Sequence, residues 1–132
     1  MKRLVILTMA AVIAIFSSYN AATGAKLNNF KNLTAYKTGD EFWLVMSFDG
    51  KPKSAVKYFE KSIQVDVTDA QTNPARKIFD VSNAGIDKIK IYQFDSKTVR
   101  IRIFPIDGDA ESLKNRITFS VKEGKLTAKL SP

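Results

Sequence analysis

Apolar and polar residues alternate along most of the chain after residue 40, and this alternation predicts β-strands. The stretch "EFWLVMSFDG" places an apolar residue at every second position, which indicates a strand with one buried face. The apolar set on that face is Phe42, Leu44, Met46 and Phe48. A shorter strand over 33–36 precedes it, and Gly39 supplies the turn that joins the two into a hairpin. Trp43 falls on the opposite face, where we expect it to line the core against a second sheet.

The middle of the chain continues the pattern less evenly. Residues 56–59 predict one strand and residues 63–68 another, with Ile63, Val65 and Val67 pointing inward. The stretch "DAQTNPARK" is typical of a loop. Residues 78–81 fit a short strand or a single turn equally well.

The clearest alternation lies in "IDKIKIYQFDSKTVRIRIFP", residues 86–105. The register predicts a hairpin with a turn at 95–97, an aliphatic inner face and a basic outer face. The inner set is Ile89, Ile91, Val99, Ile101 and Ile103. The outer set is Lys88, Lys90, Tyr92, Arg100 and Arg102. Pro105 ends the hairpin because it donates no backbone hydrogen bond, and we expect Phe104 to pack under the loop that follows.

The last part of the chain predicts a final hairpin, with strands over 116–122 and 125–130 and a turn at Glu123 and Gly124. Between the two hairpins, Gly108 and an acidic cluster favour a loop over a helical turn. Seven to nine short strands with turn residues between them are typical of a compact β-sandwich or barrel, and we predict the sandwich. We therefore predict an all-β fold built from short antiparallel strands and hairpins.

The first 25 residues have the pattern of a secretory signal peptide. Lys2 and Arg3 precede an apolar run over 4–16, which small and polar residues follow. The run is too short to span a bilayer, which takes about 20 apolar residues. We expect 1–25 to be removed, leaving 26–132 as a single exported domain with no stable transmembrane span, in the periplasm.

Composition excludes several kinds of chemistry. The chain has no histidine and no cysteine, so a Ser-His-Asp triad, a thiol nucleophile and the usual zinc sites are unavailable. Carboxylates near turns, such as Asp107 with Asp109, more often bond the backbone than act in catalysis. We expect no catalytic residue, no cofactor and no metal.

The net charge is +8 for the whole chain and about +6 without Lys2 and Arg3, and this surplus of cations favours an acidic partner. On an exported domain that partner is an anionic envelope polymer, and we expect no nucleic acid. The residues that we expect to bind it are Lys88, Lys90, Tyr92, Arg100 and Arg102. Arginine can fork to a carboxylate, and tyrosine offers a stacking surface. The alternative is that these charges only keep an exposed sheet soluble.

The order of these elements resembles the AMIN domain, a β-sandwich module of exported bacterial cell-wall amidases and type IV pilus secretins. The likeness rests on "LTAYKTGDEFWLVMSFDG", "YFEKSIQVDVTDA", "IDKIKIYQFDSKTVRIRIFP" and "EGKLTAKL" and covers roughly residues 33–130. Phe104 and Pro105 depart from the family pattern, which usually continues with an aliphatic and an acidic residue.

The resemblance implies a noncatalytic module that targets its owner to the cell envelope by binding peptidoglycan. Two alternatives stay open. The first is a protein-interaction domain of an envelope machine such as a secretin, pilus or flagellar-export component, in which an exposed strand edge pairs with another chain. The second is a hydrolase that uses carboxylates alone.

Overall fold

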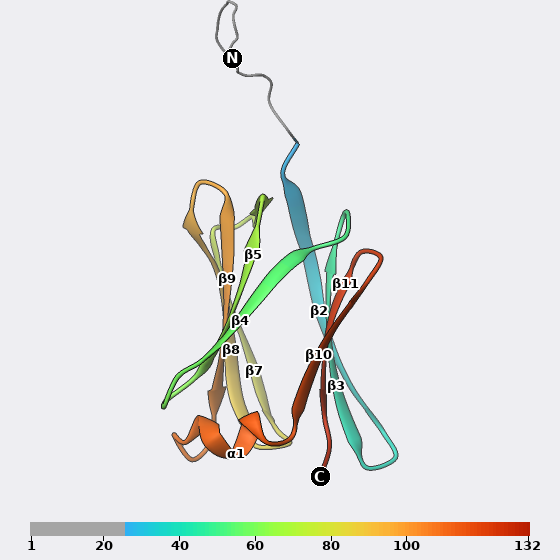
Figure 1. Ribbon diagram of the computed structural model, residues 1–132, viewed down its shortest axis with the longest axis vertical. Coiled ribbons are helices and arrows are strands. Elements are labelled where there is room, and N and C mark those ends of the chain that lie inside the picture. Colours follow the sequence, from blue (N-terminus) through green and yellow to red (C-terminus); the bar gives the residue numbers. More distant parts are fainter. Residues whose placement is uncertain (1–25) are drawn as a thin grey trace, which may run out of the picture.

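The computed structural model describes residues 26–132, which form two five-stranded sheets packed face to face (Figure 1). In spatial order the first sheet contains β10 (Ile117–Lys122), β11 (Lys125–Leu130), β3 (Glu41–Phe48), β2 (Asn28–Thr38) and β6 (Ala70–Gln71). The second contains β4 (Lys53–Tyr58), β5 (Ile63–Thr68), β9 (Thr98–Pro105), β8 (Ile86–Asp95) and β7 (Arg76–Asn83). All pairings are antiparallel except that of β2 with β6. The all-β sandwich is therefore confirmed, whereas the signal peptide predicted for 1–25 lies outside the described residues.

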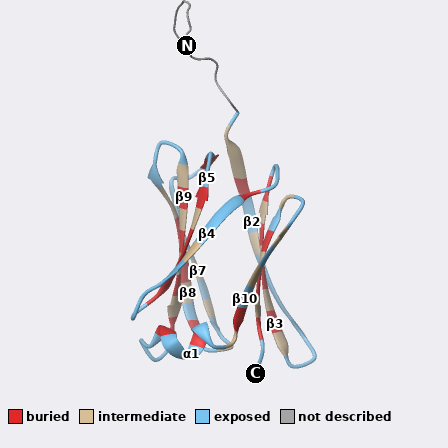
Figure 2. Ribbon diagram, in the orientation of Figure 1, coloured by how far each residue is buried: buried red, intermediate tan, exposed pale blue. Residues whose placement is uncertain are grey.

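The core lies between the sheets, and most residues of the outer faces are half-buried or exposed (Figure 2). The predicted inner faces of β3 and of the β8–β9 hairpin are confirmed, because all of their aliphatic residues are buried. In the hairpin these are Ile89, Ile91, Val99, Ile101 and Ile103, each with no exposed surface. Such complete burial of period-two residues fixes the register, since a shift by one would turn the cations inward.

The segments between the strong patterns differ from the predictions. Residues 76–83 form β7, and β6 lies inside the predicted loop, so the described residues contain ten strands rather than seven to nine. The loop predicted between the last two hairpins contains a helix, α1 (Ala110–Lys114). Asp109 caps α1 by accepting a hydrogen bond from the Glu111 N–H at 3.0 Å, and Leu113 anchors it in the core. None of the helices in residues 26–132 has the length and apolar character needed to cross a membrane.

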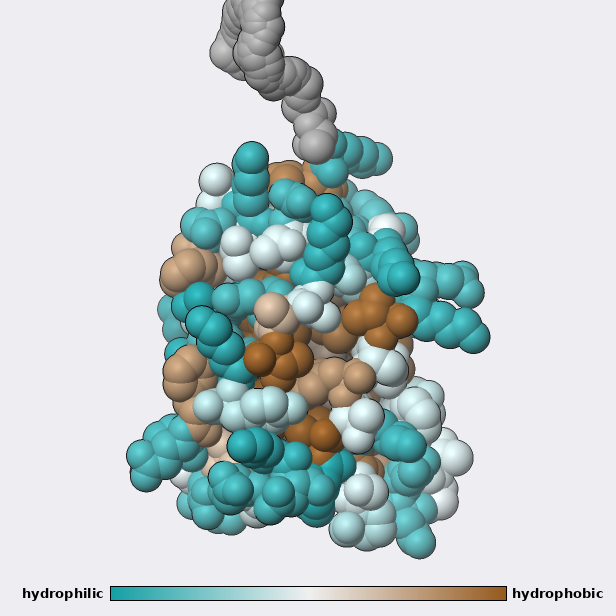
Figure 3. Space-filling model, viewed as in Figure 1, coloured by the Kyte–Doolittle hydropathy of each residue, from teal (hydrophilic) through white to brown (hydrophobic). Residues whose placement is uncertain are grey.

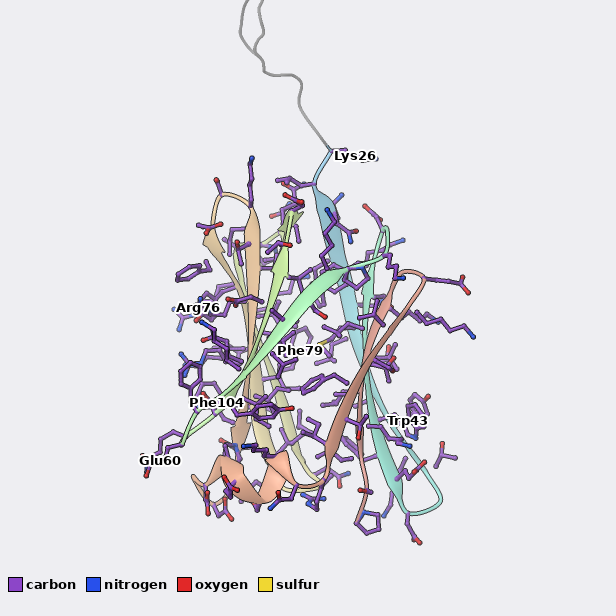
Figure 4. All side chains as sticks on the ribbon, viewed as in Figure 1. Lys26, Trp43, Glu60, Arg76, Phe79 and Phe104 are labelled. Atoms are coloured by element: carbon purple, nitrogen blue, oxygen red, sulfur yellow. The ribbon has the colours of Figure 1, made fainter. Side chains whose placement is uncertain are left out.

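Trp43 does not line the core as predicted. It lies half-buried on the outer face of β3, where its ring stacks on Tyr36 of β2 with centroids 6.1 Å apart and planes 3° apart. Figure 4 shows it on the side of the first sheet that faces away from the second. Phe42 and Leu44, its neighbours in sequence, fill the inner face, as predicted. The strand is apolar on both faces, so its pattern identified the buried face but not how Trp43 is covered on the other.

Candidate functional site

All five predicted binding residues lie together on the outer face of the second sheet. Antiparallel pairing places Tyr92 beside Arg100 and Lys90 beside Arg102, and Lys88 stands beside Phe104. Each of these side chains is half-buried, because neighbours on adjacent strands cover the aliphatic stems while the polar ends reach outward. The hairpin thus brings the residues into one patch, as its alternation predicted.

Phe104 occupies the centre of this patch rather than the underside of the following loop. The Lys88 Nζ, Lys90 Nζ and Arg102 Cζ atoms lie 6.0, 5.3 and 5.6 Å from the centroid of its ring. The prediction for Phe104 was wrong because β9 continues through Pro105, which keeps position 104 on the outer face (Figure 4). A ring among three cations screens part of their mutual repulsion through its negative face.

Arg100 already has a carboxylate within the chain. Its Nε donates to Asp66 Oδ1 at 2.9 Å and its Nη2 donates to Asp66 Oδ2 at 3.1 Å. These hydrogen bonds raise the pKa of Arg100, and the ring of Phe94 lies 3.5 Å from its Cζ atom. A guanidinium held by a fork on one side and a ring on another has little capacity left for a ligand.

Arg102 is only partly satisfied by its neighbours. Its Nη2 donates to Ser62 Oγ at 2.7 Å, and its Nε is buried without a hydrogen-bond partner among the described residues. Phe59 also approaches the guanidinium, at 5.9 Å from its Cζ. The buried Nε is out of reach of a ligand, but the single hydrogen bond to Ser62 leaves other terminal N–H groups of the guanidinium for an anion at this surface.

A hollow of about 400 Å³ opens over these strands. Its lining residues are Ala75, Arg76, Lys90, Tyr92, Gln93, Arg102 and Phe104. The lining thus combines three cations with two aromatic rings and contains no carboxylate. Such a surface suits an anionic group that carries an apolar portion.

The sequence patterns missed Arg76 in this site. Its segment, "NPARK", was interpreted as a loop, whereas Arg76 begins β7 and pairs in register with Tyr92. The signal was the continuation of apolar Ile78 and basic residues along β7, which fits an edge strand beside β8. Figure 4 places Arg76 and Phe104 on the same outer side of the molecule.

The carboxylates of Asp107 and Asp109 have structural partners. Asp107 accepts from the Asp109 N–H at 2.9 Å, so the carboxylates of this turn bond the backbone, as predicted. Among residues 26–132 no group of three or more acidic, histidine or cysteine side chains could hold a metal ion. A larger hollow, of about 610 Å³, lies beside the β10–β11 turn, but Glu123 is part of its lining.

Comparison with known proteins gives no family for this chain: no protein-family model matches it, and no curated protein sequence matches it significantly. The resemblance to the AMIN domain stays a hypothesis. The geometry of the patch is therefore the basis for a functional assignment.

Proposed function

We propose that the domain is a noncatalytic periplasmic module that targets its owner to the cell envelope by binding peptidoglycan. The observation that carries the proposal is the hollow lined by Arg76, Lys90 and Arg102 around Phe104, without a carboxylate. The stem peptides of peptidoglycan present carboxylates next to short apolar side chains. Those two features match the cations and the ring of the hollow.

The predicted residues differ in their proposed roles. Lys90 and Arg102 are the cations that face a ligand in the hollow, and Arg76 joins them from the neighbouring strand. Lys88 lies beside the hollow and contacts Phe104, so it adds to the positive field at the rim. Arg100 positions the strands through Asp66 and contributes charge without a direct contact to the ligand.

Retention on purified sacculi at low salt tests the proposal. The variant Arg76→Glu/Lys90→Glu reverses two cations of the hollow, and Lys37→Glu/Lys125→Glu makes the same change of net charge on strands of the first sheet. We expect the first variant to lose most of its retention and the second to keep most of it. High salt should weaken the retention of the wild type, because screening reduces the attraction between partly exposed charges.

Two results would contradict the proposal. Absence of wild-type retention at low salt would remove peptidoglycan as the ligand. Equal losses in the two variants would show that only the net charge matters, and that the cations on this sheet serve solubility.

A further inference from the structure

The edge strands of the two sheets differ in how well they are protected against pairing with a strand of another chain. Contacts of β7 with β2 close one side of the sandwich, since the rings of Phe79 and Phe30 lie 6.5 Å apart. The opposite ends of the sheets, β4 and β10, therefore form the other side. Figure 1 shows these two strands nearest the viewer.

Natural sheets block their edges with bulges, inward charges, proline or lysine. The edge strand β7 has a bulge between Asp80 and Asn83 and an inward Lys77, which stands in register with buried Ile91. The strand β2 has both devices as well, a bulge after Phe30 and an inward Lys37 opposite buried Phe42.

The edge strands on the side formed by β4 and β10 are less protected. β4 follows Pro52 and has two exposed lysines, Lys53 and Lys57. β10 pairs with β11 without a bulge, and its sequence, "ITFSVK", contains no proline and only one charge, at its last position. Its inner face is apolar throughout. By these criteria β10 is less protected than β2, β4 and β7.

The side chains beside β10 leave apolar surface open. Phe119 and Val121 on β10, and Val56 on β4, pack against the core but are only partly buried. Figure 3 shows apolar side chains in the middle of this side of the molecule, surrounded by hydrophilic ones. A further strand beside β10 would cover them with its own inward residues.

The backbone of β10 is oriented to accept such a strand. The Ser131 N–H donates to the Arg116 oxygen at 3.0 Å, so residue 116 belongs to a hydrogen-bonded pair with the chain that continues β11. Alternation along an antiparallel pair then directs the N–H groups of Phe119 and Val121 away from β11. These groups are available to an added strand.

We propose that β10 binds an extended acidic segment of a partner protein, with alternate apolar residues facing the gap between β10 and β4. Charge favours this occupant over a second copy of the chain. The two strands of this side, β4 and β10, have three exposed lysines, Lys53, Lys57 and Lys122, and no acidic residue. Antiparallel pairing of two β10 strands would bring Lys122 of each copy near Arg116 of the other, and like charges oppose it. This docking site is separate from the hollow proposed to bind peptidoglycan.

The test uses a fluorescent peptide of alternating glutamate and valine, with a lysine–valine peptide as the control. In the protein, Val121→Pro removes an outward N–H without removing a hydrogen bond to β11, and Val121→Thr keeps that N–H at almost the same side-chain volume. We expect the acidic peptide to bind the wild type and Val121→Thr alike. We expect about tenfold weaker binding by Val121→Pro, the equivalent of one lost backbone hydrogen bond.

A second variant, Phe119→Lys, tests the same edge without introducing a proline. Phe119→Lys places a charge on the inner face of β10, as Lys37 does on β2, and we expect it to abolish peptide binding. Urea unfolding midpoints show whether both variants fold, and unchanged sacculus retention separates this proposal from the previous one.

Several results would overturn the proposal: no binding of the acidic peptide, equal binding of the basic peptide, or equal affinity in Val121→Pro. Sedimentation that shows a dimer of the wild type, lost in Val121→Pro, would assign the edge to a second copy instead. Failure of sacculus retention alone would leave this edge site standing.

Discussion

The ion pair of Arg100 and Asp66 gives the sharpest test of how the basic face is built. Both side chains are mostly covered, with 18% and 23% of their surface exposed. Two hydrogen bonds join them in a fork. We expect Asp66→Ala to destabilise the domain, because it leaves a guanidinium that is largely out of water without its carboxylate.

The magnitude follows from this intermediate burial. Exposed pairs contribute about 0 to 1 kcal/mol, and breaking a fully buried pair costs about 3 to 5 kcal/mol. A pair that is about four-fifths covered, with a bidentate geometry, should lie between these limits, and Asp66→Ala should lower the free energy of unfolding by about 2 kcal/mol. The ring of Phe94 lies 3.5 Å from the Arg100 Cζ atom, and we expect this contact to persist in the variant and to keep the loss below that of a fully buried pair.

A double-mutant cycle separates the pair from its surroundings. Urea unfolding of the wild type, Asp66→Ala, Arg100→Ala and the double variant should give a coupling energy of about 1 to 2 kcal/mol. Sacculus retention of folded Arg100→Ala should stay near that of the wild type. A coupling energy near zero would refute the assignment of the ion pair. Sacculus retention that falls as far as in Arg76→Glu/Lys90→Glu would show that Arg100 contacts the ligand.

Three further predictions use other contacts. The Lys97 N–H donates to Asp95 and lowers the pKa of the Asp95 carboxyl. The ionised carboxylate therefore stabilises the fold above pH 3.8, and this stabilisation is lost as the pH falls below that value. Urea unfolding midpoints of Asp95→Asn should depend less on pH in that range than those of the wild type. Gly124→Ala brings a Cβ within 2.7 Å of the Phe48 oxygen, and urea unfolding should show a loss of about 1 to 3 kcal/mol. Trp43 is the only tryptophan and lies on the other sheet, so its emission should not change when peptidoglycan fragments bind the hollow; a spectral shift would place the ligand elsewhere.

The sequence was most informative where a strand pairs with its neighbour in the chain. The hairpin of β8 and β9 was predicted residue by residue, because a two-residue period and a short turn determine both faces and the register. Strand β3 was harder, since Trp43 and Val45 make its outer face nearly as apolar as its inner one. Stacking on Tyr36 compensates for that exposure, and it depends on a pairing with β2 that the hydrophobic pattern of β3 does not contain.

The candidate site was predictable only in part, for the same reason. The cations of β8 and β9 lie on one hairpin, so the pattern could group them. Arg76 reaches the hollow through β7, and Asp66 reaches Arg100 from β5, which is 34 residues away in the chain. Pairings of distant strands have no local signal, so the sequence showed neither the additional cation nor the internal partner of Arg100.

The arrangement of the strands has a consequence for how two ligands would act together. The hollow lies on the outer face of one sheet and β10 is an edge of the other, with the packed core between them. Because the lining of the hollow contains no residue of β10 and the core separates the two sites, we expect a ligand at one site to have little effect on the other. Binding energies at the two sites should therefore add, and a partner segment held at β10 would gain its position on the cell wall without losing affinity for the domain.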